Sequence, residues 1–172
     1  AEGLAADGSG YSCDPATSLA GMERALTDLD EVVQHLQGRA DVDQGRLLIA
    51  GHSRGGILSI VHAGSRPGNP FRGAINFVGG WMSDQCPNPT AINTVSFRRG
   101  GGFPGPTLWL YGENDPFYSL GHSRANHAAF LQAGGSGEFH AFQLGAGVNG
   151  HNVISFPLIW GAQVDALLAA LQ

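Results

Sequence analysis

Four short apolar runs that alternate with helical segments constrain the fold of this chain more than any other feature. Each run has strand length and little polar alternation, which is typical of strands that are covered on both sheet faces. The runs are residues 46–50, 73–78, 106–111 and 138–144, the last of them interrupted by His140 and Gln143. Strands that alternate with helices favour right-handed crossovers and a parallel sheet. The sequence therefore predicts a three-layer α/β fold with about four parallel strands and helices on both faces.

Helical segments fill the intervals between these runs. The first has clear boundaries, because Asp14 and Pro15 make a good N-cap and first-turn pair and Gly38 is a typical stop. Between them, apolar residues recur at helical spacing, namely Leu19, Met22, Leu26, Leu29, Val33 and Leu36. Further helices are expected at 55–63, 118–133 and 156–171, with a shorter one near 90–97. Residues 1–13 show no period, so we expect an irregular lead-in followed by a single domain over 14–172.

Composition excludes several classes of protein. The chain has 172 residues, close to one domain, and 42% of them are hydrophobic, which is enough for a real core. Nine arginines against 14 acidic residues give a net charge of −5, and only Arg98 and Arg99 adjoin, so the sequence has no basic stripe for nucleic acid. No apolar stretch approaches the roughly 20 residues of a membrane helix. No signal peptide is recognisable, which leaves the compartment open.

The two cysteines, Cys13 and Cys86, are too few for a disulfide scaffold and lack the paired spacing of a zinc site. They can still form one bridge, which would tie the N-terminal lead to the long loop after the second apolar run. The sequence leaves the bridged and the free state equally open. It implies neither a metal nor an organic cofactor.

The segment from Gly51 to Gly56, Gly-His-Ser-Arg-Gly-Gly, stands between the first apolar run and a predicted helix. It contains Gly-x-Ser-x-Gly in the strand-to-helix context of a nucleophile elbow. Small residues at Gly51 and Gly55 would let the chain bend sharply and lift the Ser53 hydroxyl above the sheet edge. The backbone N–H of Arg54 would face the negative charge that develops on a substrate oxygen. The bare pattern is common in a chain rich in Gly and Ser, but its position favours Ser53 as a nucleophile.

A serine nucleophile needs a histidine base and a carboxylate that orients the base. Asp115 follows the third apolar run and His151 follows the fourth, so both are expected at the carboxyl ends of strands, where ligands bind in parallel sheets. We predict Asp115 as the acid and His151 as the base. The alternative for Asp115 is a helix cap, with Glu113 and Asp84 as lesser candidates for the acid. The alternative for His151 is an ordinary surface histidine.

The other histidines have structural interpretations. His52 adjoins Ser53, but neighbours on an elbow point in different directions, so His52 is poorly placed to take the serine proton. His140 lies inside a predicted strand. The remaining ones fall on or beside predicted helices, namely His35, His62, His122 and His127.

Ser53, Asp115 and His151 occur in the order nucleophile, acid, histidine, each after a different predicted strand. In this order, and in segments 51–56, 111–115 and 150–151, the sequence resembles the α/β-hydrolase superfamily, in particular its dienelactone-hydrolase-like and prolyl-oligopeptidase-like branch. The resemblance covers about residues 14–172. Dienelactone hydrolases proper use cysteine as the nucleophile, so the resemblance does not extend to their lactone substrate.

The resemblance also implies a truncated sheet. Family members have several strands before the elbow, whereas a single helix precedes it here. The strands of this chain would then be the last ones of the family sheet, with the elbow strand 46–50 at an open edge. The absent part supplies one oxyanion-hole N–H in the family, which leaves that of Arg54. Because an apolar edge strand invites another strand, we expect it to be covered, most simply in a homodimer or else by a second fragment.

The resemblance implies that the chain hydrolyses small-molecule carboxylic esters through an acyl-enzyme intermediate on Ser53, with no cofactor and no membrane or nucleic-acid partner. Apolar residues after the second and third runs are expected to line the substrate pocket, with core packing as the alternative: Phe77, Trp81, Met82, Phe117 and Tyr118. Two other functions stay open. One is a serine peptidase of the oligopeptidase type, and the other is a non-catalytic α/β-hydrolase remnant that binds a partner chain.

Overall fold

A single sheet of four parallel strands forms the centre of the computed structural model, which describes residues 12–171. The strands are β1 (Leu48–His52), β2 (Gly73–Phe77), β3 (Thr107–Gly112) and β4 (Gly137–Phe142). They lie side by side in sequence order, with Ala50 beside Ile75, Ile75 beside Leu108 and Leu108 beside Glu138. The predicted α/β fold with a parallel sheet and β1 at its edge is confirmed.

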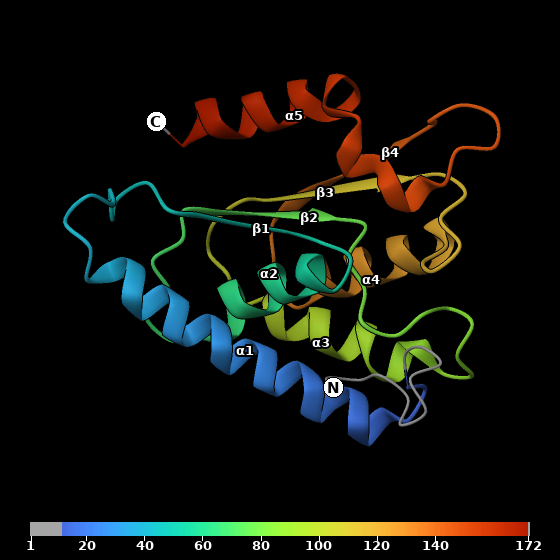
Figure 1. Cartoon of the computed structure of the whole chain (residues 1–172), viewed down its shortest axis with the longest axis horizontal. Helices are drawn as coiled ribbons and strands as arrows, with labels where there is room; N and C mark the ends of the chain where they lie inside the picture. Colours follow the sequence, from blue (N-terminus) through green and yellow to red (C-terminus); the bar gives the residue numbers. More distant parts are fainter. Residues whose placement is uncertain (1–11, 172) are drawn as a thin grey trace.

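Helices lie on both faces of this sheet (Figure 1). One face carries α5 (Pro157–Ala170), and the other carries α2 (Arg54–Ser65), α3 (Asn93–Gly100) and α4 (Leu120–Gln132). The long first helix, α1 (Pro15–Gln37), packs outside α2. Two short 3₁₀ helices, η1 (Pro89–Ala91) and η2 (Gly150–Ser155), lie in the loops after β2 and β4. None of the described helices is long and apolar enough to cross a membrane.

The helix α1 begins as the sequence predicts, since the Asp14 carboxylate accepts the Thr17 N–H at 2.7 Å. Met22 and Leu26 are fully buried, but Leu19 of the predicted apolar stripe is 38% exposed. The stripe is covered only in part because α1 rests on α2 and not on the sheet. The predicted lead-in, residues 1–13, lies outside the described residues except for 12 and 13, which have no regular secondary structure.

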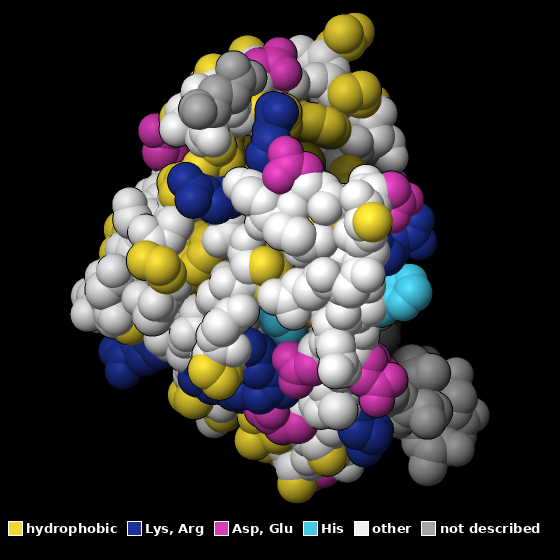
Figure 2. Space-filling model, turned by 90° about the vertical axis from the view of Figure 1, so that its left-hand side faces the viewer, with side chains coloured by type: hydrophobic (Ala, Val, Ile, Leu, Met, Phe, Trp, Pro, Cys, Tyr) yellow, Lys and Arg dark blue, Asp and Glu magenta, His cyan; other side chains and the backbone are white. Residues whose placement is uncertain are grey.

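Charged side chains hold α1 against the helices beneath it. The buried His62 ring of α2 lies 2.9 Å from the Asp30 carboxylate, and Arg66 lies 3.2 Å from the same group. Arg99 of α3 pairs with Glu23. Burial lowers the pKa of His62, and the hydrogen bond to Asp30 opposes this effect. Figure 2 shows positive and negative side chains interspersed on this side of the molecule, as expected for paired charges.

The central strands and the edge strand β1 differ in burial. All residues of β2 and β3 are buried. On β1, however, Ala50 is exposed, so the expectation that run 46–50 is covered on both faces is wrong there. The reason is the position of α5, which packs over β3 and reaches β2, where the rings of Trp160 and Phe77 meet at 4.9 Å. No described element covers Ala50.

Candidate active site

Ser53 occupies the turn between β1 and α2, with φ 56° and ψ −121°. This backbone conformation is strained for any residue other than glycine and is typical of functional turns. Backbone hydrogen bonds tie it to the end of β2 and the loop beyond: the Ser53 N–H donates to the Phe77 carbonyl at 2.9 Å, and the Gly80 N–H donates to the Ser53 carbonyl at 3.3 Å. The Ser53 hydroxyl does not cap α2. The turn therefore has the geometry of a nucleophile elbow.

Close backbone contacts explain the glycines around this turn. A Cβ on Gly51 would lie 2.0 Å from the Gly55 carbonyl oxygen, so residue 51 must be glycine, as predicted. A Cβ on Gly55 would meet nothing within 4 Å, so the space around this residue does not require glycine. The second position that requires glycine is Gly56, where an added Cβ would lie 2.4 Å from the Asn76 side-chain oxygen.

His151 and Asp115 form the hydrogen-bonded pair that the sequence predicts. His151 Nδ1 lies 2.9 Å from Asp115 Oδ2, and the Asp115 side chain is fully buried. Because a carboxylate only accepts, Nδ1 carries a proton, and Nε2 of the neutral ring is free to accept one. Asp115 Oδ1 also accepts the N–H groups of Phe117 and Tyr118, at 2.8 and 3.2 Å. Asp115 thus both caps a turn and orients His151.

His52 places this pair beside the elbow. Its Nε2 lies 2.7 Å from the His151 carbonyl oxygen, and the two rings have centroids 4.8 Å apart. Since His52 directly precedes Ser53, the contact sets the His151 loop against the Ser53 turn. Sequence reasoning considered His52 only as a base. A side chain that bonds the backbone of a residue 99 positions away leaves no signal in the sequence.

The lesser candidates for the acid lie elsewhere. Among the described residues, Asp115 is the carboxylate within hydrogen-bond distance of His151. Asp84 instead accepts the Ser119 N–H at 2.8 Å and lies 3.7 Å from His122. Glu113 makes no hydrogen bond to His151.

The remaining histidines have structural surroundings, as the sequence suggests. His140 bonds Glu138 at 3.0 Å on β4, and the ring of His127 packs 4.9 Å from that of Trp109. Burial lowers the pKa of both His122 and His127. His35 is exposed near the end of α1.

Two of the expected pocket residues line the His151 ring. The ring centroid of Phe117 lies 4.8 Å from that of His151, and that of Tyr118 lies at 5.7 Å. Tyr118 is buried, whereas Phe117 is half-buried. Phe117 is therefore placed to contact a molecule bound at this histidine.

The expected pocket residues that follow β2 belong to the core. Trp81 and Met82 are 3% and 2% exposed. Asn93 fixes their backbone, because its side-chain oxygen accepts both of their N–H groups at 2.9 Å. Phe77 packs against α5, as described above. The Arg54 guanidinium lies 4.5 Å from the centre of the Trp81 ring, so Trp81 supports the residue that follows Ser53.

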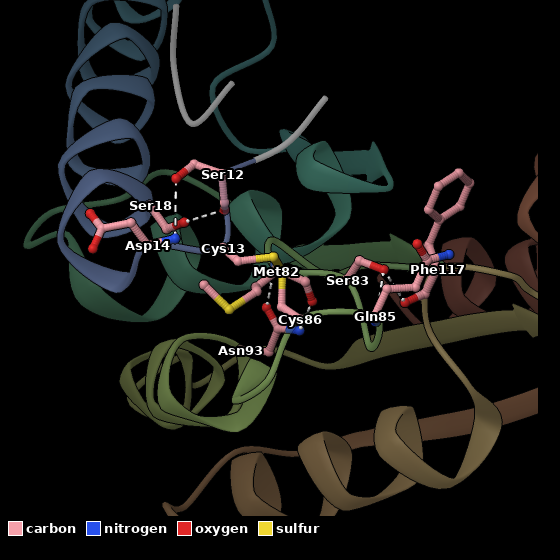
Figure 3. Close-up of a disulfide and its surroundings, with 10 residues drawn as sticks. All are labelled: Ser12, Cys13, Asp14, Ser18, Met82, Ser83, Gln85, Cys86, Asn93 and Phe117. Atoms are coloured by element: carbon pink, nitrogen blue, oxygen red, sulfur yellow. Dashed lines mark hydrogen bonds between the residues drawn. A yellow bond between two sulfur atoms is a disulfide. The ribbon is translucent and has the colours of Figure 1, made fainter. Parts of the chain in front are cut away.

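A disulfide joins Cys13 to Cys86 (Figure 3). It links the start of α1 to the loop that follows β2. The same loop braces the segment after Asp115, because the Ser83 hydroxyl and the Asp84 N–H both donate to the Phe117 carbonyl, at 3.3 and 2.8 Å. Of the two states that the sequence left open, the structure has the bridged one.

A cavity of about 520 Å³ lies outside this site. It is located between α5 and the starts of β3 and β4, at the opposite end of the strands from Ser53. The described part of the chain contains no group of three His, Cys, Asp or Glu side chains that could hold a metal ion.

Comparisons with known proteins give structural likeness only. No protein-family model and no curated protein matches the sequence. SOBER1 from Arabidopsis thaliana is similar, with 16% identity, a TM-score of 0.57, and coverage of 94% of this chain and 67% of that one. A Klebsiella pneumoniae protein assigned as a dienelactone hydrolase has 22% identity and a TM-score of 0.58, over 86% and 61% of the two chains. The esterase Pf2001 from Pyrococcus furiosus has 14% identity and a TM-score of 0.67, over 86% and 62%.

These likenesses extend over most of this chain but over only 61% to 67% of the three neighbours. Partial coverage agrees with the small number of strands in the sheet. At such low identities the likeness concerns the fold and not the activity. The chain has the α/β-hydrolase fold.

Proposed function

We propose that this chain is a serine hydrolase that cleaves carboxylic esters. The observation that supports this most is the hydrogen bond between His151 and Asp115, together with the contact between His151 and His52, the residue before the strained Ser53 turn. A buried carboxylate on Nδ1 leaves Nε2 as the proton acceptor, as a serine nucleophile requires. Esterases are also among the proteins of similar structure.

The proposed reaction proceeds in two stages. Ser53 Oγ attacks the ester carbonyl carbon while His151 Nε2 accepts the hydroxyl proton, and Asp115 stabilises the resulting imidazolium. The tetrahedral intermediate then loses its alcohol, which takes the proton from His151, and the acyl group remains on Ser53. Water, deprotonated by His151, attacks the acyl carbon. The carboxylic acid leaves, and Ser53 recovers its proton.

Negative charge on the carbonyl oxygen would be stabilised at the start of α2. The N-terminus of a helix carries partial positive charge, which favours a negatively charged oxygen there. In this mechanism the Arg54 N–H is one oxyanion donor. Loss of a single donor from such a site typically lowers turnover about 100- to 1000-fold. We therefore expect slow hydrolysis as long as no second donor joins Arg54.

A fluorophosphonate probe and a p-nitrophenyl ester test the proposal together. The wild-type protein should take one covalent label on Ser53 and hydrolyse the ester, and Ser53→Ala should do neither while it keeps its circular dichroism spectrum. Ser155→Ala, which changes an exposed serine of η2, is the matched control and should behave as wild type. Cleavage of peptide anilides in preference to esters would indicate a peptidase. A folded wild-type protein that shows neither labelling nor turnover would overturn the hydrolase and leave a binding protein.

A further inference from the structure

We propose that His52 is a positioning residue that holds His151 in register with Ser53; the proposal rests on the function proposed above. The carbonyl oxygen of His151 can only accept a hydrogen bond, so His52 Nε2 is the donor across the 2.7 Å contact. The proton of the neutral His52 ring is then on Nε2. The side chain takes no part in proton transfer, because it is committed to the backbone of the base.

The contacts of His151 restrain its ring, its backbone N–H and its carbonyl group. Asp115 fixes the ring through Nδ1, and Phe117 packs against the ring with centroids 4.8 Å apart. The backbone N–H donates to the Asn149 side-chain oxygen at 2.8 Å. His52 holds the carbonyl on the other side of the same residue. The base is therefore fixed at its ring and at both of its peptide groups.

The contact from His52 differs from the others because it originates on the strand that carries the nucleophile. Asn149, Asp115 and Phe117 belong to loops that follow β3 and β4, whereas His52 is the last residue of β1. A shift of the His151 loop relative to β1 would break the contact to His52 and would loosen the one to Asp115, which lies on a different loop. Proton transfer needs a donor–acceptor distance of about 2.6 to 3.2 Å. His52 thus links the two elements whose separation sets that distance.

Three variants test the proposal. His52→Phe keeps a ring against His151 but removes the N–H, and we expect kcat for p-nitrophenyl acetate to fall about three- to tenfold, as for the loss of one hydrogen bond, with KM unchanged. The labelling of Ser53 should slow by the same factor. His52→Gln supplies an N–H at similar reach and should restore most of kcat. The control His140→Phe removes an imidazole from β4, far from the elbow, and should match wild type.

A readout without turnover separates the positioning role from the proposed function. The Nδ1 proton between His151 and Asp115 is expected to give a downfield proton NMR signal, which should broaden in His52→Phe and persist in His52→Gln. If wild type proves inactive, the signal still reports on His151, so the two proposals fail separately. Wild-type kcat together with an unchanged signal in His52→Phe would overturn the positioning role. If His52→Phe does not fold, His52→Asn, whose amide is too short to reach the carbonyl, decides by the same two criteria.

Discussion

At the scale of single residues, the two oxygens of the Asp115 carboxylate have separate tasks. Oδ1 accepts backbone N–H groups that form the turn into α4, and Oδ2 accepts the proton of His151 Nδ1. The side chain is fully buried, so these donors replace the water that a carboxylate would otherwise bind. Because the tasks fall on different atoms, substitutions can separate them.

Asp115→Asn should keep the fold and lose the proposed activity. Asparagine can retain an oxygen toward the turn, but an amide NH₂ facing His151 favours the wrong imidazole tautomer, at a cost on the order of 10⁴-fold in kcat. Asp115→Ala should also lose the cap, which typically contributes about 1 kcal/mol of stability. Ester hydrolysis and urea unfolding measure the two effects. Asp115→Asn with full activity would contradict the assignment and return Asp84 and Glu113 as candidates.

The neighbouring glycines Gly55 and Gly56 should respond differently to alanine. A methyl group on Gly56 would lie 2.4 Å from the Asn76 side-chain oxygen and 2.8 Å from the Gly79 Cα, whereas one on Gly55 would meet nothing within 4 Å. We expect Gly56→Ala to lower the free energy of unfolding by about 1 to 3 kcal/mol, as overpacking does. Gly55→Ala should be neutral or slightly stabilising, because alanine favours the helix. Equal urea midpoints for the two variants would argue against this packing.

The sequence predicted the residues of the proposed site better than their contacts. Ser53, Asp115 and His151 each follow a different strand in the expected order, and a parallel sheet brings such positions to one edge. The structure pairs two of them, His151 and Asp115. The role of His52 was missed because its partner is a carbonyl group, which every residue carries. The sequence pattern pointed to Gly55 as the second small residue of the turn, whereas the tightly packed one is Gly56. The pattern alone does not show which of the two glycines faces Asn76.

At the scale of elements, the disulfide connects α1 to the loop that braces the segment after Asp115. Cys13 and Cys86 are 73 positions apart, so the bridge closes a long loop of the unfolded chain. The Cys86 loop in turn bonds the Phe117 carbonyl, two residues after Asp115. Loss of the bridge should therefore affect both the stability of the protein and the order of the proposed site.

Replacement of both cysteines, Cys13→Ser with Cys86→Ser, should lower the free energy of unfolding by about 2 to 4 kcal/mol. Esterase activity should fall more in this variant than in a stability-matched control such as Leu26→Ala, which creates a cavity between α1 and α2, away from Asp115. Urea unfolding and ester turnover are the measurements. Thiol titration of the denatured, unreduced wild type should find no free thiol, and two free thiols would contradict the bridge.

Element boundaries followed from the sequence to within a few residues. The run 46–50 became β1 over Leu48–His52, because the strand continues to the residue before the elbow. The predicted helix 90–97 divides into η1 and α3, and Ile92 stands between them at the N-cap position of α3. The 3₁₀ helix η2 was not predicted, since its only local signal is the Asn149 cap. The partial exposure of α1 and β1 could not be predicted, because it depends on which elements cover them.

At the scale of the whole molecule, the edge strand β1 has a side that no described element covers. The N–H of Ser53 and the carbonyl of Leu47 bond to the β2 side. In a parallel strand, the N–H and C=O groups of successive residues point alternately to the two sides. Those of Leu48, Ala50 and His52 therefore face away from β2, and no described strand pairs with them. The neighbouring α5 is apolar on nearly all sides, with Asp165 as its one charged residue, and a helix of this kind normally lies buried. Such an edge favours association.

We expect a second copy of the chain to cover this edge. A two-fold axis beside Ala50 would pair β1 antiparallel with its equivalent, and the interface would be self-complementary because both edges are apolar. Light scattering at micromolar concentration should then report two chains per particle. Ala50→Lys, which places a charge on the uncovered face of β1, should yield monomers, whereas Ala141→Lys on the opposite edge strand β4 should leave dimers. A wild-type monomer with full esterase activity would contradict this arrangement and would mean that the oxyanion donors are complete within one chain.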